Sequence, residues 1–299
     1  MNVQHQEIQS LLHAPELQAQ PTRRLALQSA LGVGYAAAAM PLMAQTAIKT
    51  SGEGLLQGEV TIEVQGFKMP AYRSMPAGAR NCPVVLVISE VFGVHEYIAD
   101  VTRRLAHAGY MAIAPELFVR QGDPSEYGEL AKLFAEIINK VPDAQVMGDL
   151  DACVQWAASQ GGDVKRLGIT GFCWGGRITW LYAMHNPQLR AAVAWYGRLT
   201  GDKTTFLPSH PLDQATALKA PTLGLYAGQD AGISQASVDA MKAALAAQKS
   251  NAAAQGSSFV VYPGVPHAFH ADYRPSYRER EAKDGWQRML DWFRRHGLA

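Results

Sequence analysis

The stretch Gly171-Phe-Cys-Trp-Gly-Gly176 decides the fold, because it sets Cys173 between glycines directly after a short apolar run, residues 166–170, and directly before an amphipathic segment. This is a nucleophile-elbow pattern, in which a sharp strand-to-helix turn exposes a reactive side chain above a sheet. Such a turn is strained and closely packed, so Gly171 and Gly175 are favoured because they lack a side chain. The alternative is a buried structural cysteine that happens to lie near glycines. Cys82 and Cys153 lack this context and are expected to be small core residues.

Around this turn, the chain alternates helical segments with short continuous apolar runs, which are residues 84–89, 111–114, 167–170, 191–196, 222–227 and 259–262. Such runs are typical of strands buried on both faces of a mostly parallel sheet. Before them, residues 59–64 and 67–74 alternate in polarity and predict paired strands around Gln65-Gly66. Trp286, Leu290 and Phe293 lie at helical spacing and predict a last helix packed on the sheet. The sequence therefore predicts a single α/β domain, with helices flanking a mostly parallel central sheet, over residues 47–299.

The first 46 residues have a different character. Thr22-Arg23-Arg24-Leu25 precedes a weakly apolar segment rich in alanine and glycine, residues 26–43, and then the small residues near 44–47. This pattern predicts a twin-arginine export signal over residues 1–46, recognised by the export machinery and cleaved near residues 44–47. The mature protein would then be periplasmic. An uncleaved membrane anchor and a cytoplasmic protein are the alternatives.

Composition narrows the function classes. The chain has 48% hydrophobic and 18% charged residues and a formal net charge of +1. Without a basic stripe, this balance argues against a nucleic-acid partner. Three cysteines are too few for a disulfide scaffold. The expected class is an ordinary soluble enzyme with one large core.

Polar side chains follow the predicted strands at their carboxyl ends, where sites of open α/β sheets lie. Glu90, Arg120, Cys173, Asp230 and His267 occupy these positions. A thiol reacts as thiolate, so it needs a base and a group that orients the base. The chain order suggests Cys173 as nucleophile, His267 as base and Asp230 as the residue that fixes the histidine tautomer.

Each assignment has an alternative. His270, three residues after His267, is a rival base, and the resulting H-x-x-H pattern lacks a carboxylate or cysteine at ligand spacing, so no metal is expected. Asp230 could instead cap a following helix, and Glu90 could cap the segment after it and support the adjoining loop. Arg120 could form a surface ion pair.

From about Gly58 to its end, the chain resembles the dienelactone hydrolase family, also called carboxymethylenebutenolidases, of the α/β-hydrolase fold. The resemblance rests on Ser89-Glu-Val-Phe-Gly93, Ala114-Pro-Glu-Leu-Phe118, Gly171-Phe-Cys-Trp-Gly-Gly176, Gly228-Gln-Asp230 and His267-Ala-Phe269. It implies a triad of Cys173, Asp230 and His267, with Glu90 as the resting partner of the thiol. It also implies a cofactor-independent hydrolase that opens a lactone or cleaves a small activated ester through a thioester intermediate.

The resemblance further implies that the backbone N–H groups of Val91 and Trp174 stabilise the oxyanion. Two other enzyme reactions, acyl transfer and peptide cleavage, are possible on the same scaffold. A non-catalytic periplasmic binding protein is the alternative from another class. An intact set of three triad residues argues against it.

Carboxylate recognition is where the sequence departs from the family. The resemblance implies that Arg120 helps to bind a substrate carboxylate. Enzymes of the chloroaromatic pathways carry a serine directly after the histidine and an arginine four residues after it, whereas this chain has Ala268 and Ala271. Arg274 is close enough in sequence to substitute for the missing arginine. Dienelactone itself is therefore not the expected substrate.

Overall fold

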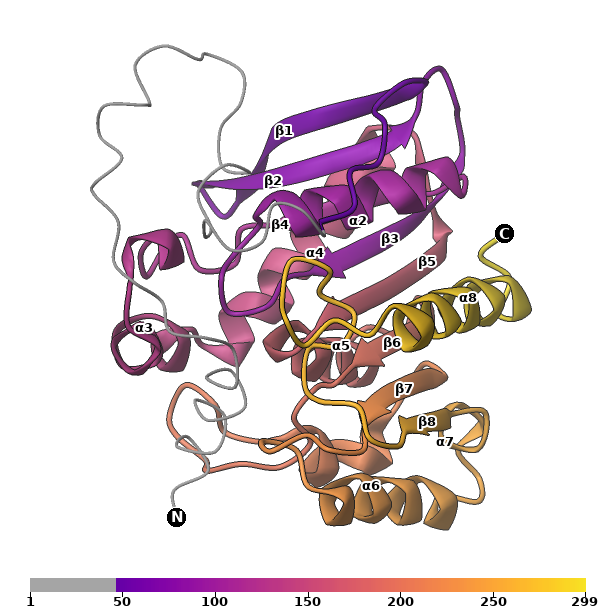
Figure 1. Ribbon diagram of the computed structural model, residues 1–299. Coiled ribbons are helices and arrows are strands. Elements are labelled where there is room, and N and C mark those ends of the chain that lie inside the picture. Colours follow the sequence, from indigo (N-terminus) through magenta and orange to yellow (C-terminus); the bar gives the residue numbers. More distant parts are fainter. Residues whose placement is uncertain (1–46) are drawn as a thin grey trace.

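The computed structural model describes residues 47–299 (Figure 1). The predicted export signal lies outside the described residues, so it stays a prediction. The strands are β1 (Leu55–Val64), β2 (Phe67–Pro76), β3 (Cys82–Ile88), β4 (Met111–Pro115), β5 (Gly162–Phe172), β6 (Leu189–Trp195), β7 (Thr222–Ala227) and β8 (Ser258–Tyr262). The α-helices are α2 (Glu96–His107), α3 (Leu130–Glu136), α4 (Asp143–Ser159), α5 (Trp174–His185), α6 (Gln235–Ala247), α7 (Ala252–Gln255) and α8 (Glu279–Arg295). Within residues 47–299, no helix is both long and apolar enough to cross a bilayer.

All eight of these strands form one sheet in the order β1-β2-β4-β3-β5-β6-β7-β8. Strand β2 is antiparallel to both β1 and β4, and every pair from β4 to β8 is parallel. The predicted hairpin is present, with Gln65 and Gly66 at φ values of 50° and 84°. A two-residue turn with positive φ at both positions matches the twist of the strands it joins. The prediction of a mostly parallel α/β fold is confirmed.

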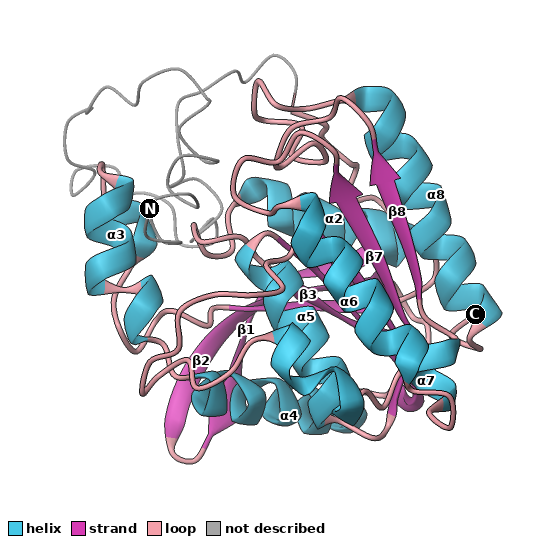
Figure 2. Cartoon of the chain, turned by 90° about the horizontal axis from the view of Figure 1, so that it is seen from below, coloured by secondary structure: helices cyan, strands magenta, loops and turns pink. Residues whose placement is uncertain are grey.

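Helices cover both faces of the sheet. Helices α2 and α8 pack on one face, while α4 and α5 pack on the other. Figure 2 shows β7 and β8 running between α8 and α6. Every residue of β3, β4 and β7 is buried as a result. This double burial explains why these strands are continuous apolar runs rather than alternating ones.

The starts of two strands, β1 and β5, were predicted about four or five residues too late. Strand β5 begins at Gly162, five residues before the predicted run, and β1 begins at Leu55 rather than Glu59. The added part of β5 is polar and partly exposed, yet it pairs with Cys82 and Pro83 of β3. A pattern of apolar residues predicts only the buried part of a strand. The exposed part pairs through its backbone, which does not require apolar side chains.

The first described residues lie against α2. Asp100, which is fully buried, accepts hydrogen bonds from the backbone N–H of Thr50 at 2.6 Å and from its hydroxyl at 3.1 Å. Arg104 bridges Asp100 and Asp272, with both nitrogen–oxygen distances at 2.5 Å. These ion pairs join α2 to the loop that follows β8, and that loop carries residues of the site.

Candidate active site

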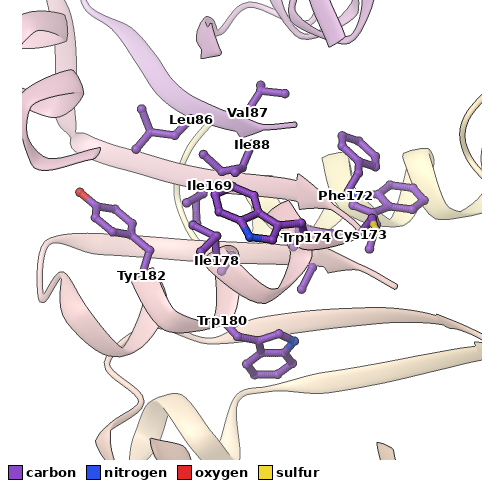
Figure 3. Packing of buried hydrophobic residues seen from close by; sticks show 14 of the residues in the cluster. Leu86, Val87, Ile88, Ile169, Phe172, Cys173, Trp174, Ile178, Trp180 and Tyr182 are labelled. Atoms are coloured by element: carbon purple, nitrogen blue, oxygen red, sulfur yellow. The ribbon is translucent and has the colours of Figure 1, made fainter. Parts of the chain in front are cut away.

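Cys173 occupies the predicted elbow between β5 and α5. It has φ of 56° and ψ of −114°, and its side chain is buried (Figure 3). A non-glycine residue with positive φ is held against steric strain, which persists only where the surrounding structure fixes it. The N–H of Cys173 donates to the carbonyl of Trp195 at 3.0 Å, which ties the elbow to the end of β6. The elbow therefore presents the thiol at the carboxyl edge of the sheet.

The flanking glycines allow the elbow to be packed this closely. A Cβ on Gly171 would lie 2.3 Å from the carbonyl oxygen of Gly175. A Cβ on Gly175 would lie 2.4 Å from the carbonyl oxygen of Ile88 and 2.5 Å from that of Ser89. The start of α5 is thus in contact with the end of β3, so Trp174 lies beside the Glu90-Val91 loop. The backbone N–H groups of Val91 and Trp174 have no hydrogen-bond partner within residues 47–299.

Asp230 and His267 form a buried pair at the ends of β7 and β8. Nδ1 of His267 donates to Oδ2 of Asp230 at 2.5 Å. The other carboxylate oxygen accepts the N–H groups of Gly232 at 2.8 Å and Ile233 at 3.1 Å. These bonds fix the carboxylate, which in turn fixes the tautomer of the histidine. Asp230 does not cap the next helix, because Ser234 caps α6.

The surroundings of His267 make its imidazole a stronger base than a free histidine. Burial by itself lowers its pKa, but the negative charge of Asp230 and the thiolate form of Cys173 outweigh burial and raise the pKa well above its usual value. Nε2, the nitrogen opposite the Asp230 bond, is buried and has no hydrogen-bond partner among the described residues. This nitrogen is therefore the one available to a thiol or a substrate.

His270, the rival base, has a different environment. Its Nδ1 lies 2.6 Å from the hydroxyl of Tyr97. Its ring stacks on Phe172 and Trp286, with centroid distances of 5.2 Å and 5.9 Å. Burial lowers its pKa well below the usual value. His270 is thus a neutral core histidine. Within residues 47–299, no group of three histidine, cysteine or acidic side chains is placed to hold a metal ion.

Glu90 is fully buried at the end of β3. Its Oε2 accepts a hydrogen bond from the hydroxyl of Tyr273 at 2.7 Å and lies 3.4 Å from Nε2 of His95. Burial by itself raises the pKa of Glu90, but His95, the Arg274 charge and the Tyr273 bond outweigh burial and lower it. Glu90 is therefore a buried carboxylate. It does not cap α2, whose N-cap is His95.

No hydrogen bond joins Glu90 to Cys173 among the described residues, and Oε1 of Glu90 has no hydrogen-bond partner there. This oxygen is the one that a neutral thiol could approach. The predicted partnership of Glu90 with the resting thiol stays a prediction.

Comparison with known proteins identifies the family. The family model described as "Dienelactone hydrolase family" matches residues 69–297. The chain belongs to the dienelactone hydrolase family. A relative from Methylorubrum extorquens, named "Putative carboxymethylenebutenolidase", is 55% identical over 279 residues, which is 93% of this chain and 94% of the relative. A relative of the same name from Escherichia coli K12 is 55% identical over 265 residues, or 88% of this chain and 96% of the relative.

A solved structure gives the same result. The crystal structure titled "Putative Dienelactone Hydrolase" from Klebsiella pneumoniae is 57% identical, with a TM-score of 0.77 over 80% of this chain and 98% of that one. These comparisons confirm the family that the motifs predicted. They also confirm the α/β-hydrolase fold and the enzyme class, a hydrolase that acts on esters or lactones.

The two arginines that the sequence predicts to bind the substrate differ in their surroundings. Arg274 is buried, and its guanidinium carbon lies 5.8 Å from the ring centroid of Phe92. Its burial by itself lowers the pKa, but the nearby acidic groups Tyr273, Glu90 and Cys173 outweigh burial and raise it. Arg274 therefore lies near Glu90 and Cys173.

Arg120 forms an ion pair, which the sequence analysis gave as the alternative to substrate binding. Its two terminal nitrogens donate to Asp149 of α4 at 2.6 Å and 2.8 Å. Its guanidinium carbon also lies 4.2 Å from the ring centroid of Phe67. Two of its donors are therefore occupied by a buried carboxylate. Its predicted role in substrate binding stays a prediction.

Sequence reasoning missed two tyrosines of the site. Tyr196 directly follows β6, has φ of 39°, and lies edge-on to His267 at a centroid distance of 5.0 Å. Its buried hydroxyl has no hydrogen-bond partner within the described chain. Tyr273 holds Glu90. The position of Tyr196 after a strand is a signal that could have found it, whereas Tyr273 follows no strand directly and carries no such signal.

Proposed function

We propose that this protein hydrolyses a lactone or a small activated ester through a thioester on Cys173. The observation that carries the proposal is the strained elbow of Cys173 beside the buried His267–Asp230 pair. In nucleophilic catalysis, a strained turn holds the thiol in position, and an oriented histidine activates it. A binding protein has no need for it.

In the proposed reaction, Nε2 of His267 takes the thiol proton while Sγ of Cys173 attacks the carbonyl carbon. The N–H groups of Val91 and Trp174 stabilise the resulting oxyanion, since neither has another partner among the described residues. The carbon–oxygen bond then breaks, and His267 gives its proton to the leaving oxygen. Water attacks the thioester with its proton passing to His267. The carbon–sulfur bond breaks and releases the acid. The thiolate of Cys173 then regains its proton from His267.

Glu90 has a proposed regulatory part in this reaction. A buried carboxylate near Cys173 disfavours a thiolate by repulsion between like charges, so the resting thiol stays neutral. Its full burial and its unpartnered Oε1 support this role. An anionic substrate would displace or repel Glu90 and so couple binding to activation.

The direct test is to incubate the mature protein with short-chain chromogenic esters and lactones and to look for an acyl adduct by mass spectrometry. We expect turnover, together with the mass of the acyl group on the peptide that contains Cys173. The peptides with Cys82 and Cys153 are internal controls and should stay unmodified. Binding of esters without turnover or adduct would contradict the proposal and favour a non-catalytic role.

Recognition of a substrate carboxylate is assigned to Arg274 rather than to a pocket at Ala268 and Ala271. Arg274→Met should lower kcat/KM for anionic lactones about 10- to 100-fold more than for neutral esters, because a hydrogen bond to a charged group contributes about 1.5–3 kcal/mol. Arg120→Met is the matched comparison. Since its partner is Asp149, we expect equal losses on both substrates and a lower melting temperature. Selective loss on anionic lactones in Arg120→Met alone would reverse the assignment.

A further inference from the structure

A cavity of about 200 Å³ lies beyond the oxyanion loop, residues 91–95, and no step of the proposed reaction uses it. Its walls come from this loop and from the segment that follows β4. The lining includes the apolar side chains of Phe92, Val94, Val119 and Pro124 and the polar side chains of His95 and Glu116. Asp123 and Ser125 also line it, so the cavity combines apolar walls with polar groups that could orient a small organic group.

The cavity shares its wall with the active site. Phe92 directly follows Val91, and it lies under the guanidinium of Arg274 at 5.8 Å. His95 lines the cavity while its Nε2 lies 3.4 Å from Glu90. Phe92 and His95 therefore lie between the cavity and the charged groups Arg274 and Glu90.

The sheet order decides which part of an ester faces the cavity. Asp230 and His267 follow β7 and β8, on one side of β5. The cavity is built after β3 and β4, on the other side of β5. The leaving group must lie near His267, which protonates it. The acyl group therefore extends toward the cavity.

Glu116 gives the cavity its selectivity. Its Oε1 accepts the N–H of Val94 at 3.0 Å, and a Cβ on Gly93, which has φ of 74°, would lie 3.0 Å from Oε2. Burial, with smaller contributions from the charges of Asp123 and Glu59, raises the pKa of Glu116 to about 7. A carboxyl group of this kind is protonated in much of the protein at neutral pH and can donate a hydrogen bond to an oxygen atom.

We propose that this cavity binds the acyl chain of the substrate, and that it selects an uncharged, mainly apolar chain ending in a hydroxyl or carbonyl oxygen that hydrogen-bonds to Glu116. The proposal rests on the proposed function for the identity of the acyl group. A carboxylate at the end of the acyl chain is disfavoured here by the negative charge of Asp123 and by the ionised fraction of Glu116. The substrate class is thus a lactone or ester with at most one carboxylate, which lies at Arg274, and a neutral polar group at the far end of its acyl chain.

The test uses p-nitrophenyl esters whose acyl chains have equal length and end in a methyl, a hydroxyl or a carboxylate group. In Arg274→Met, which has no guanidinium to bind the carboxylate elsewhere in the site, kcat/KM should be at least tenfold higher for the hydroxyl ester than for the carboxylate ester. Val119→Trp, which fills the cavity, should lower kcat/KM for the long esters at least tenfold relative to the acetyl ester. Leu56→Trp, on an exposed part of β1, is the matched control and should leave this ratio unchanged.

Glu116→Gln tests the acidic group separately, because glutamine keeps an oxygen for the Val94 N–H. It should reduce the discrimination against the carboxylate ester above pH 7. Calorimetric binding of the corresponding amides to the Cys173→Ala protein gives a readout that needs no turnover. Selective binding without any ester turnover would support the cavity and contradict the proposed function. Ester turnover with an unchanged chain ratio in Val119→Trp, or equal use of hydroxyl and carboxylate esters by Arg274→Met, would overturn the cavity proposal alone.

Discussion

Cys173→Ala is expected to lower kcat/KM for short esters by at least about 10⁴-fold, because loss of the nucleophile removes the concerted action of the whole triad. Alanine keeps the β carbon, so it should adopt the same φ of 56° that cysteine adopts. The fold should therefore persist. Initial rates with a chromogenic ester measure the loss, and circular dichroism checks the fold.

The other two cysteines are the controls for this prediction. Cys82 and Cys153 are both buried, and burial raises the pKa of each thiol. A protonated core thiol is a poor nucleophile. Cys82→Ala and Cys153→Ala should keep most of the activity. Full activity in Cys173→Ala, or its loss in one of the control variants with an intact fold, would contradict the mechanism.

Gly175→Ala should destabilise the protein by about 3 kcal/mol, at the upper end of the usual range for overpacking. The new methyl group would lie 2.4 Å from one backbone oxygen and 2.5 Å from another at the end of β3. Both neighbours are backbone atoms of a fully buried strand, so neither can move by a side-chain rotation. Either α5 or the oxyanion loop must shift, and turnover should fall together with stability. Urea denaturation measures the first effect and ester hydrolysis the second.

The matched control is Gly148→Ala in α4. Gly148 is exposed, and an added methyl group would have no described atom within 4 Å. Alanine in place of glycine inside a helix should stabilise the protein by about 0.5–1 kcal/mol. Equal denaturation midpoints for the two variants would show that the close approach at Gly175 is not what restricts this position.

Much of the fold could be predicted because strands that are buried on both faces of the sheet form continuous apolar runs in the sequence. The bounds of β7 were predicted to the residue, since every residue of that strand is buried. The polar start of β5 was not predicted, because its pairing with Cys82 and Pro83 uses backbone groups that every residue has. The pattern of apolar residues thus predicts the buried strands of the sheet better than their exposed ends.

The site could be predicted in part. The elbow at Cys173 was predicted because its two requirements, two close glycines and a strand before a helix, are visible in a short stretch of sequence. Tyr273 and His95 were missed because their importance comes from contact with Glu90, which is far from Tyr273 in the chain. The cavity beside Glu116 was missed for the same reason.

The sequence by itself determined the elbow, the buried strands and the chain order of the candidate triad. Local sterics require glycines at the elbow, and hydrophobic burial requires apolar runs in the strands. Only the tertiary structure decided between His267 and His270, which differ in that one contacts Asp230 and the other Tyr97. It also paired Arg120 with Asp149 and brought Arg274 close to Glu90 and Cys173. Charges and hydrogen bonds act over a few ångströms of space whatever their separation in sequence, so such partners are known only when the chain is folded.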